Sequence, residues 1–207
     1  MNQITSNSSQ GDNLKSVCSW GGIATIIVIL LTVVDIIVGS VLGGYLTSIP
    51  QSATGRFIQI SENPFLGLYN LDLLNMIVSV FMIPSFLALF IIHSKNVFIQ
   101  ALFALIVFTI GTTIFIANNS ALPMLELSHK YNNASSDEQR MLISAAGETM
   151  IARGAHGGYG VFPGFMLVTF SELLISVVMF KGNVFSKATS CFGIAGISLL
   201  IAFQFLH

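Results

Sequence analysis

Charged residues are scarce in this sequence: only 8% of its 207 residues are Asp, Glu, Lys or Arg, whereas 54% are hydrophobic. Soluble domains carry roughly 25% charged residues, because they must cover a surface that faces water. The composition therefore excludes an ordinary soluble protein and predicts an integral membrane protein. The net charge is -1, whereas nucleic-acid-binding proteins typically carry an excess of basic residues, so we expect no nucleic-acid partner.

Cysteine and histidine are few and scattered. Cys18 and Cys191 lie too far apart for a metal or redox motif, and the histidines form no HExxH pair. Glu126 and His129 make a single Glu-x-x-His, whereas a di-iron bundle needs two such motifs and two further carboxylates. The histidines supply no paired axial ligands for haem. We therefore expect no metal and no cofactor, and the missing nucleophile argues against a membrane enzyme acting on lipid.

Long apolar runs are what the sequence does contain. A transmembrane helix needs about 20 apolar residues. Five stretches are long enough: residues 21–46, 73–92, 97–117, 161–180 and 188–206. The sequence thus predicts an all-α membrane bundle of five transmembrane helices over residues 19–207, after a polar, disordered leader at residues 1–18. No lysine lies inside a predicted span, which excludes a retinal-type Schiff base.

Basic residues near the ends of the spans indicate the orientation. With the N-terminus in the cytoplasm, Lys15, Lys95, Lys181 and Lys187 lie at short cytoplasmic segments, and the other four basic residues lie outside. Three of those four lie in one long connection, where basic residues constrain topology less. We therefore expect a multi-pass cell-membrane protein whose N-terminus is cytoplasmic and whose connection at residues 118–160 is extracytoplasmic.

This connection is predicted to be helical. Ser135 to Glu138 form a capping-box pattern, which predicts a helix from Asp137 to Arg153. A shorter helix is predicted to begin near Pro123. One face of the longer helix is expected to be buried against the membrane surface or over the mouth of the bundle, and it consists of Leu142, Ala145, Ala146, Thr149 and Met150.

Asp35 lies among Leu, Ile and Val residues in the first predicted span. A charged side chain at the bilayer centre costs roughly 2.5–3.5 kcal/mol on insertion scales, so it needs a partner or a cavity. Gly39 and Gly43 follow on the same helical face, at i+4 and i+8, and predict a surface where another helix packs closely. We therefore expect Asp35 to face protein and not lipid.

Glu172 lies near the middle of the fourth predicted span, between Thr169 and Ser176 on one helical face. Asp72 begins a third polar face at the outer end of the second span. We expect Asp35 and Glu172 to share a polar cavity, with Asp72 as a further candidate ligand-binding residue. The alternative for Asp35 and Glu172 is a protonated structural donor, and the alternative for Asp72 is a role at a helix N-terminus.

The spans contain no basic residue that could neutralise these carboxylates. Compensation would come from Arg56 or Arg153 folding inward, from protons, or from a bound cation. Arg153 and His156, in RGAHGGYGVFPG, are therefore candidate binding residues at the outer mouth of the bundle. The glycines around His156 are equally compatible with a flexible linker before the fourth span.

The C-terminal half is similar to a known family. Residues 120–150, SALPMLELSHKYNNASSDEQRMLISAAGETM, and residues 173–196, LLISVVMFKGNVFSKATSCFGIAG, carry the similarity. Its elements are Leu127-Ser128 with Tyr131, Ala146-Gly147-Glu148, Ser176 to Met179, and Phe185 to Thr189. This pattern resembles the prokaryotic membrane family called domain of unknown function 4386. The resemblance implies a multi-pass prokaryotic membrane protein, with six spans in some members, and it brings no established activity.

Two hypotheses of function follow from these residues. The first is a bundle whose carboxylate-lined cavity binds a small ligand, a cation or a proton, for transport or sensing. The second is an accessory subunit that docks onto a larger membrane complex or onto a second copy of itself. Carboxylates within about 6 Å of each other or of an arginine would favour the first, and carboxylates dispersed against separate partners would favour the second.

Overall fold

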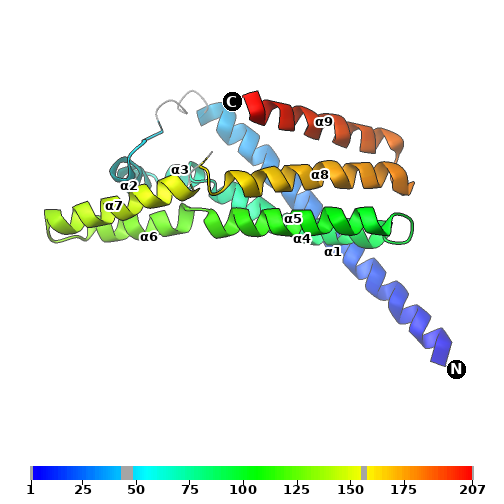
Figure 1. The fold of residues 1–207 in the computed structure, drawn as a ribbon. Helices are drawn as coiled ribbons and strands as arrows, with labels where there is room; N and C mark the ends of the chain where they lie inside the picture. The colour runs from blue at the N-terminus through cyan, green and yellow to red at the C-terminus, as the bar shows by residue number, and fades with distance from the viewer. Residues whose placement is uncertain (1, 43–48, 155–157, 207) are drawn as a thin grey trace. The chain divides into compact units, whose positions relative to one another are not determined.

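The computed structural model describes residues 2–42, 49–154 and 158–206 (Figure 1). All regular secondary structure in these ranges is helical. The helices are α1 (Asn2–Leu42), α2 (Ala53–Glu62), α3 (Pro64–Tyr69), α4 (Leu73–His93), α5 (Phe98–Asn118), α6 (Ala121–Asn132), α7 (Asp137–Gly154), α8 (Phe162–Gly182) and α9 (Lys187–Leu206). The all-α fold predicted from the sequence is confirmed for these residues.

Among the described residues, four helical stretches are long and apolar enough to cross a membrane: Leu14–Val41, Leu73–Asn132, Phe162–Gly182 and Lys187–Gln204. The second stretch has 60 residues and contains α4, α5 and α6. The chain therefore has the composition of a membrane-embedded protein. The predicted first span ends at residue 46, and its last part lies outside the described residues.

The N-terminal segment differs from the sequence prediction. A disordered leader was expected at residues 1–18, whereas α1 is helical from Asn2 onward. No proline interrupts this segment. Extending a helix that already exists adds one hydrogen bond for each residue fixed, which is far less costly than nucleating a new helix. The apolar part of α1 can therefore support helical structure in its polar extension.

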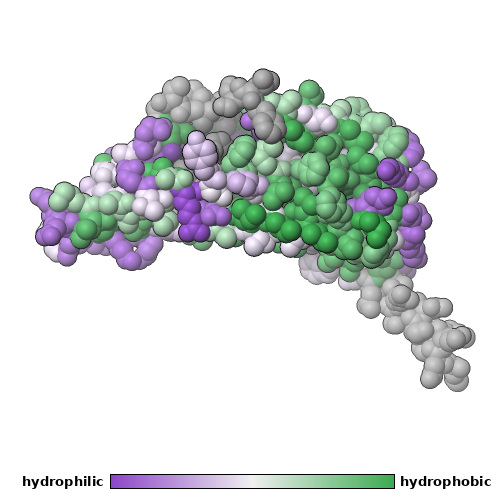
Figure 2. Space-filling view, in the orientation of Figure 1, coloured by the Kyte–Doolittle hydropathy of each residue, from purple (hydrophilic) through white to green (hydrophobic). Residues whose placement is uncertain are grey.

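The chain divides into two compact units. The first comprises Met1–Leu30, Ser79–Thr112 and Phe165–His207, and the second comprises Leu31–Val78 and Thr113–Gly164. In the first unit, α8 and α9 run side by side, and on the face shown in Figure 2 hydrophobic side chains gather over α5 and α8. Its core contains Phe86 of α4 and Phe108 of α5, whose rings stack with centroids 3.9 Å apart.

Within the first unit, α1 packs closely against α4 at Gly21. A Cβ atom at Gly21 would overlap with the Cβ of Ala88 and lie 3.1 Å from the carbonyl oxygen of Pro84. One turn further along α1, the hydroxyl of Thr25 lies 2.9 Å from that of Ser85. Close packing of α1 was expected only at Gly39 and Gly43, so this contact corrects the prediction. Its cause is the pairing of Gly21 with a small residue, Ala88, on a distant helix.

In the second unit, four short helices form one cluster, which we call the short-helix cluster: α2, α3, α6 and α7. Its core consists of Ala53, Phe57, Ile60, Leu71, Ala121 and Met124. Helices α6 and α7 were expected from the sequence, whereas α2 and α3 were not. Both carry start signals, because the side chain of Ser52 accepts a hydrogen bond from the Gly55 amide and that of Asn63 accepts one from the Leu66 amide.

Helix α7 begins as expected, but only part of its expected apolar face packs against the short-helix cluster. Its N-terminus is capped by Ser136, whose hydroxyl accepts a hydrogen bond from the Gln139 amide at 3.2 Å. Gly147 lies against α2, and a Cβ atom there would be 2.6 Å from both Ala53 and Phe57. Of the expected apolar face, Leu142 is 67% exposed, whereas Met150 packs against the core of the short-helix cluster. Contact of this face with a membrane surface stays a prediction. The closest approach of α2 falls on the glycine, and this turns the larger residue outward.

Candidate functional site

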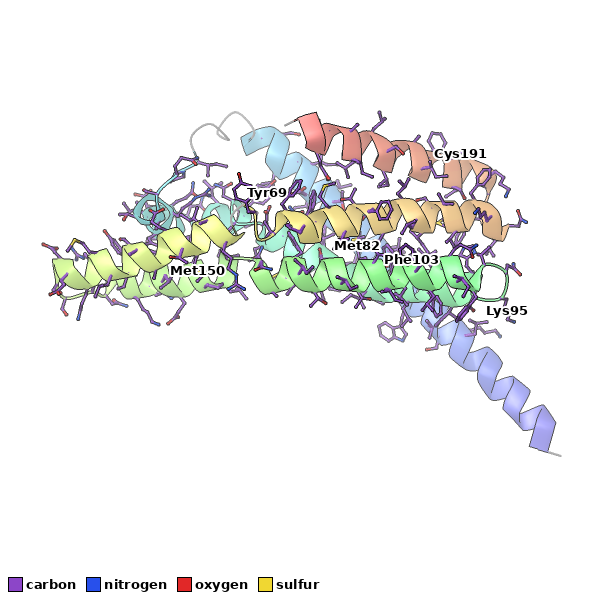
Figure 3. All side chains as sticks on the ribbon, in the orientation of Figure 1. Tyr69, Met82, Lys95, Phe103, Met150 and Cys191 are labelled. Carbon is purple, nitrogen blue, oxygen red and sulfur yellow. The ribbon has the colours of Figure 1, made fainter. Side chains whose placement is uncertain are left out.

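The second unit gives Asp35 a specific partner. The hydroxyl of Tyr69, at the end of α3, donates a hydrogen bond to Oδ1 of Asp35 at 3.0 Å, and it lies 3.3 Å from the Asp35 carbonyl oxygen. A Cβ atom on Gly39 would lie 3.3 Å from the same hydroxyl. The face of α1 that carries Asp35 and Gly39 is therefore in contact with Tyr69, which is labelled in Figure 3. Asp35 faces protein here, as the sequence predicted.

The depth of Asp35 follows from its place in α1. It lies six residues before Val41, where the apolar stretch of the described part of α1 ends. At 1.5 Å per residue this is about 9 Å from the end of the stretch. Tyr69 belongs to α3, which is not part of any candidate span. The Asp35 side chain therefore meets a partner from a helix outside the candidate spans.

Asp72 and Arg56 extend this polar site. Asp72 is 8% exposed and lies directly before α4, in the position expected for a helix N-terminal residue. Its Oδ1 accepts a hydrogen bond from the Asn75 side chain at 3.1 Å. Arg56 of α2 is only 5% exposed, and its Nη1 donates to the carbonyl oxygen of Asn70 at 3.3 Å. Arg56 is thus buried within the second unit, while its expected compensation of the carboxylates in the spans stays a prediction.

Electrostatic effects connect these groups. Burial raises the pKa of Tyr69 to about 12, and the hydrogen bond to Asp35 and the negative charges of Asp35 and Asp72 raise it in the same direction. Burial lowers the pKa of Arg56, and the negative charge of Asp72 partly offsets this effect. The negative charges of Asp35 and Asp72 thus act on Tyr69, and that of Asp72 also acts on Arg56. We call Asp35, Tyr69, Asp72 and Arg56 the Asp35–Tyr69 site.

The charge balance of this site has a direct consequence. Counted in their ordinary charge states, the two carboxylates and the guanidinium group have a formal net charge of -1, and Tyr69 is neutral at physiological pH. A proton or a cation would neutralise that charge. Oxygen atoms of carboxylates and hydroxyls are suitable ligands for hard cations. Asp35 and Tyr69 thus supply oxygen atoms of the kind that bind hard cations.

A neighbouring network fixes the backbone around the site. The side chain of Asn119, in the turn between α5 and α6, donates to the carbonyl oxygens of Leu71 and Asp72 at 3.1 and 3.3 Å. Its Oδ1 accepts a hydrogen bond from the Ala121 amide. Asp72 adopts a positive φ of 62°, a conformation that favours glycine and costs energy for other residues. Asn119 holds this strained turn in place.

Arg153 and His156 were predicted as binding residues at the mouth of the bundle. Arg153 donates from Nε to the side chain of Asn118 at 2.8 Å and from Nη2 to the carbonyl oxygen of Ala117 at 3.2 Å. Its guanidinium therefore satisfies acceptors at the C-terminus of α5, where a positive charge is favourable. This is a structural role. His156 and Gly43 lie outside the described residues.

Glu172 belongs to the first unit and is described separately. It lies in α8 between Thr169 and Ser176, both of which are buried. Their hydroxyls donate to the carbonyl oxygens of Phe165 and Glu172 in the same helix. Asp35 belongs to the second unit, so their shared cavity stays a prediction.

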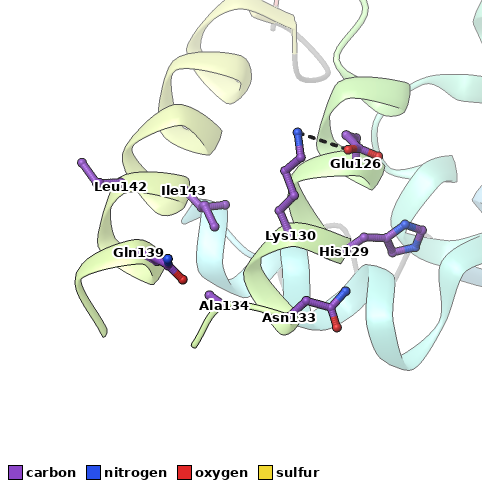
Figure 4. A pocket seen from close by; sticks show the side chains of 8 residues that line it. All are labelled: Glu126, His129, Lys130, Asn133, Ala134, Gln139, Leu142 and Ile143. Carbon is purple, nitrogen blue, oxygen red and sulfur yellow. Dashed lines mark ion pairs between the residues drawn. The ribbon is translucent and has the colours of Figure 1, made fainter. Parts of the chain in front are cut away.

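The isolated Glu-x-x-His motif lies in a surface groove between α6 and α7, drawn in Figure 4. The groove has a volume of about 510 Å³ and is lined by Glu126, His129, Lys130, Asn133, Ala134, Gln139, Leu142 and Ile143. Glu126 is paired with Lys130 at 3.2 Å, one helical turn away. Within the described ranges, no group of three or more Asp, Glu, His or Cys side chains is arranged to hold a metal ion.

Comparisons with known proteins do not add a function. The chain matches no family model, and searches of curated proteins and of solved structures find no match. The resemblance of residues 120–196 to domain of unknown function 4386 stays a prediction. The functional argument therefore rests on the residues themselves. Sequence reasoning missed Tyr69, although its place shortly after the Asn63-Pro64 helix start and before Asp72 indicates the end of a short helix beside a span.

Proposed function

We propose that this chain is a multi-pass cell-membrane protein that binds a small cation or a proton at the Asp35–Tyr69 site. The observation that carries the proposal is the 3.0 Å hydrogen bond from Tyr69 to Asp35, in a site whose residues have a formal net charge of -1. A carboxylate in a largely apolar helix is costly, and such residues usually mark ion or proton pathways. A bound cation would offset that cost.

The proposed topology has five spans: α1, α4, α5, α8 and α9. Helices α4 and α5 have 21 residues each, or about 31 Å, which matches the thickness of a bilayer core. The N-terminus is cytoplasmic, and the short-helix cluster is extracytoplasmic. A cysteine at Ser135, in a variant without the two native cysteines, should react with a membrane-impermeant maleimide added to intact cells. Reaction only after the cells are opened would reverse this orientation.

At the site, the carboxylate of Asp35 would be the charged ligand of the cation, and the phenol oxygen of Tyr69 a neutral one. Protonation of Asp35 would remove the charged ligand, so cation binding and proton binding would compete. A rise in pH would therefore strengthen cation binding until Asp35 is fully ionised.

Thermal unfolding of the protein in nanodiscs tests the proposal. Sodium chloride and calcium chloride are compared with choline chloride at equal ionic strength. A cation that binds the folded state at 100 times its Kd adds about 2.7 kcal/mol to the free energy of unfolding. We expect one of the two cations to raise the Tm of the wild type and of Asp137→Asn, an exposed control. The proposal fails if Asp35→Asn shows the same rise, or if no cation and no pH change affects the wild type.

One observation favours the second candidate, an accessory subunit. Met141 and Leu142 are each 67% exposed on α7, next to each other in the short-helix cluster. If this pair docks onto a partner, Met141→Ser with Leu142→Ser should reduce the size of the native complex on blue-native electrophoresis of solubilised membranes. An unchanged complex would remove the support for this candidate.

A further inference from the structure

The first unit contains a polar contact between α8 and α9 that the proposed function does not use. Two contacts define how these antiparallel helices pair. Gly193 of α9 lies against Ser176 of α8, since a Cβ atom there would be 2.6 Å from the serine hydroxyl. At the other end, Nε2 of Gln204 lies 3.5 Å from the hydroxyl of Thr169. Glu172 falls between Thr169 and Ser176 on the same face of α8, so it faces α9.

Gln204 carries an acceptor that lacks a donor. Thr169 donates its hydroxyl proton to the Phe165 carbonyl, so it accepts from Nε2 of Gln204, and this fixes the orientation of the amide. Oε1 of Gln204 then points elsewhere, is buried, and has no hydrogen-bond partner in the described part of the chain. A buried acceptor without a donor costs roughly 1–3 kcal/mol. The contact therefore has a place for one more proton donor.

Glu172 can supply that donor. It lies one helical turn from Thr169, on the face of α8 that meets α9. An ionised carboxylate has no proton to give, whereas a protonated carboxyl group donates one. The protonated form also avoids placing a charge in an apolar span. One proton on Glu172 would therefore both supply a donor for Oε1 of Gln204 and remove the charge from the span.

We propose that Glu172 is a proton-binding site in the α8–α9 contact, where its carboxyl group donates to Oε1 of Gln204 when protonated. Proton loss leaves a charge facing α9 and removes the donor, so it weakens this helix pair. The site is distinct from the Asp35–Tyr69 site, and the inference stands or falls independently of cation binding there.

Other titratable groups near this contact are few. Within the described part of the first unit, α5 has none, and those of α1, of α4 with the turn after it, and of α9 lie at or near the ends of helices or of the apolar stretch of α1: Asp12, Lys15, Cys18, His93, Lys95, Lys187 and Cys191. Cys191 is labelled on α9 in Figure 3. On α8 itself, Lys181 is nine residues from Glu172, about 13 Å along the helix. The proton on Glu172 is therefore controlled mainly by its own surroundings.

Labelling with dicyclohexylcarbodiimide, an apolar carbodiimide, tests the inference in nanodiscs. The carboxyl O–H adds across one C=N bond: the proton goes to nitrogen and the carboxyl oxygen bonds to carbon. The acyl group then migrates to nitrogen, giving a stable N-acylurea with no atom lost. Only a protonated carboxyl group reacts, and the apolar reagent reaches groups within the bilayer. We expect mass spectrometry to place the label on Glu172, and Glu172→Gln to lose it.

Two further arms make the test specific. Gln204→Leu removes the acceptor of the proposed hydrogen bond, so the pH at which labelling is half-maximal should fall by about half a unit to one unit. Gln100→Leu, an exposed glutamine on α5, is the matched control and should leave it unchanged. Absence of label on Glu172 in a folded protein overturns the proposal. Slower labelling in sodium chloride than in choline chloride also overturns it, because it would assign a cation to Glu172.

Discussion

The contact of α1 with α4 provides a matched pair of substitutions on adjacent residues. Gly21 and Gly22 lie in the same helix, but a Cβ atom at Gly21 would overlap with Ala88, whereas nothing lies within 4 Å of one at Gly22. Replacing either glycine by alanine gains up to about 1 kcal/mol of helix stability, because alanine loses less backbone entropy. Gly21→Ala must in addition push Ala88 and the Pro84 backbone away, at a cost of about 1–3 kcal/mol.

The difference between the two variants isolates the cost of that overlap. Because the gain in helix stability is the same for both, Gly21→Ala should be about 1–3 kcal/mol less stable than Gly22→Ala. At about 2–4 °C per kcal/mol for a chain of this size, their Tm values should differ by roughly 2–12 °C. Thermal unfolding of both purified variants in one detergent measures the difference. Equal Tm values, or a higher one for Gly21→Ala, would refute the close packing of α1 on α4.

Further predictions concern the second unit. Phe57→Ala should cost about 3–5 kcal/mol, because the side chain is fully buried and its ring lies 5.4 Å from that of Tyr131. Ile58→Ala, on the exposed side of α2, should cost much less in the same thermal assay. The Tyr69 phenol should keep its proton to a pH of about 12, and Asp35→Asn should lower its pKa, as followed by phenolate absorbance against Tyr69→Phe. Because this folded-state pKa lies above the ordinary value, its contribution to stability is complete below pH 10 and is lost between pH 10 and about 12. An unchanged tyrosine titration in Asp35→Asn would contradict the hydrogen bond.

The long helices could be predicted closely from the sequence. The predicted stretches 73–92, 97–117, 161–180 and 188–206 agree with α4, α5, α8 and α9 to within two residues at each end. Their bounds follow from the lengths of apolar runs, which are local properties of the chain. Helices α2 and α3 were missed because they are short and mix polar with apolar residues. Only their capping residues, Ser52 and Asn63, indicate where they begin.

The Asp35–Tyr69 site depends on contacts between residues that are far apart in the sequence, and no local sequence pattern indicates such contacts. The sequence identified Asp35 and Asp72 as candidates, because carboxylates in or beside apolar spans are unusual. It could not identify Tyr69, which is 34 residues from Asp35 and has an ordinary aromatic neighbourhood. The same limit applies to Gly21 and to the buried face of α7, where the partner helix, and not the sequence period, decides which residue is covered.

Infrared difference spectroscopy of the protein in nanodiscs tests cation binding at Asp35 most directly. Spectra are recorded in the chloride of the stabilising cation and in choline chloride at equal ionic strength. The account predicts a difference band in the carboxylate-stretch region that is present in the wild type and in Asp137→Asn, absent in Asp35→Asn, and shifted in Tyr69→Phe. A difference band that persists unchanged in Asp35→Asn would show that Asp35 is only a structural acceptor for Tyr69.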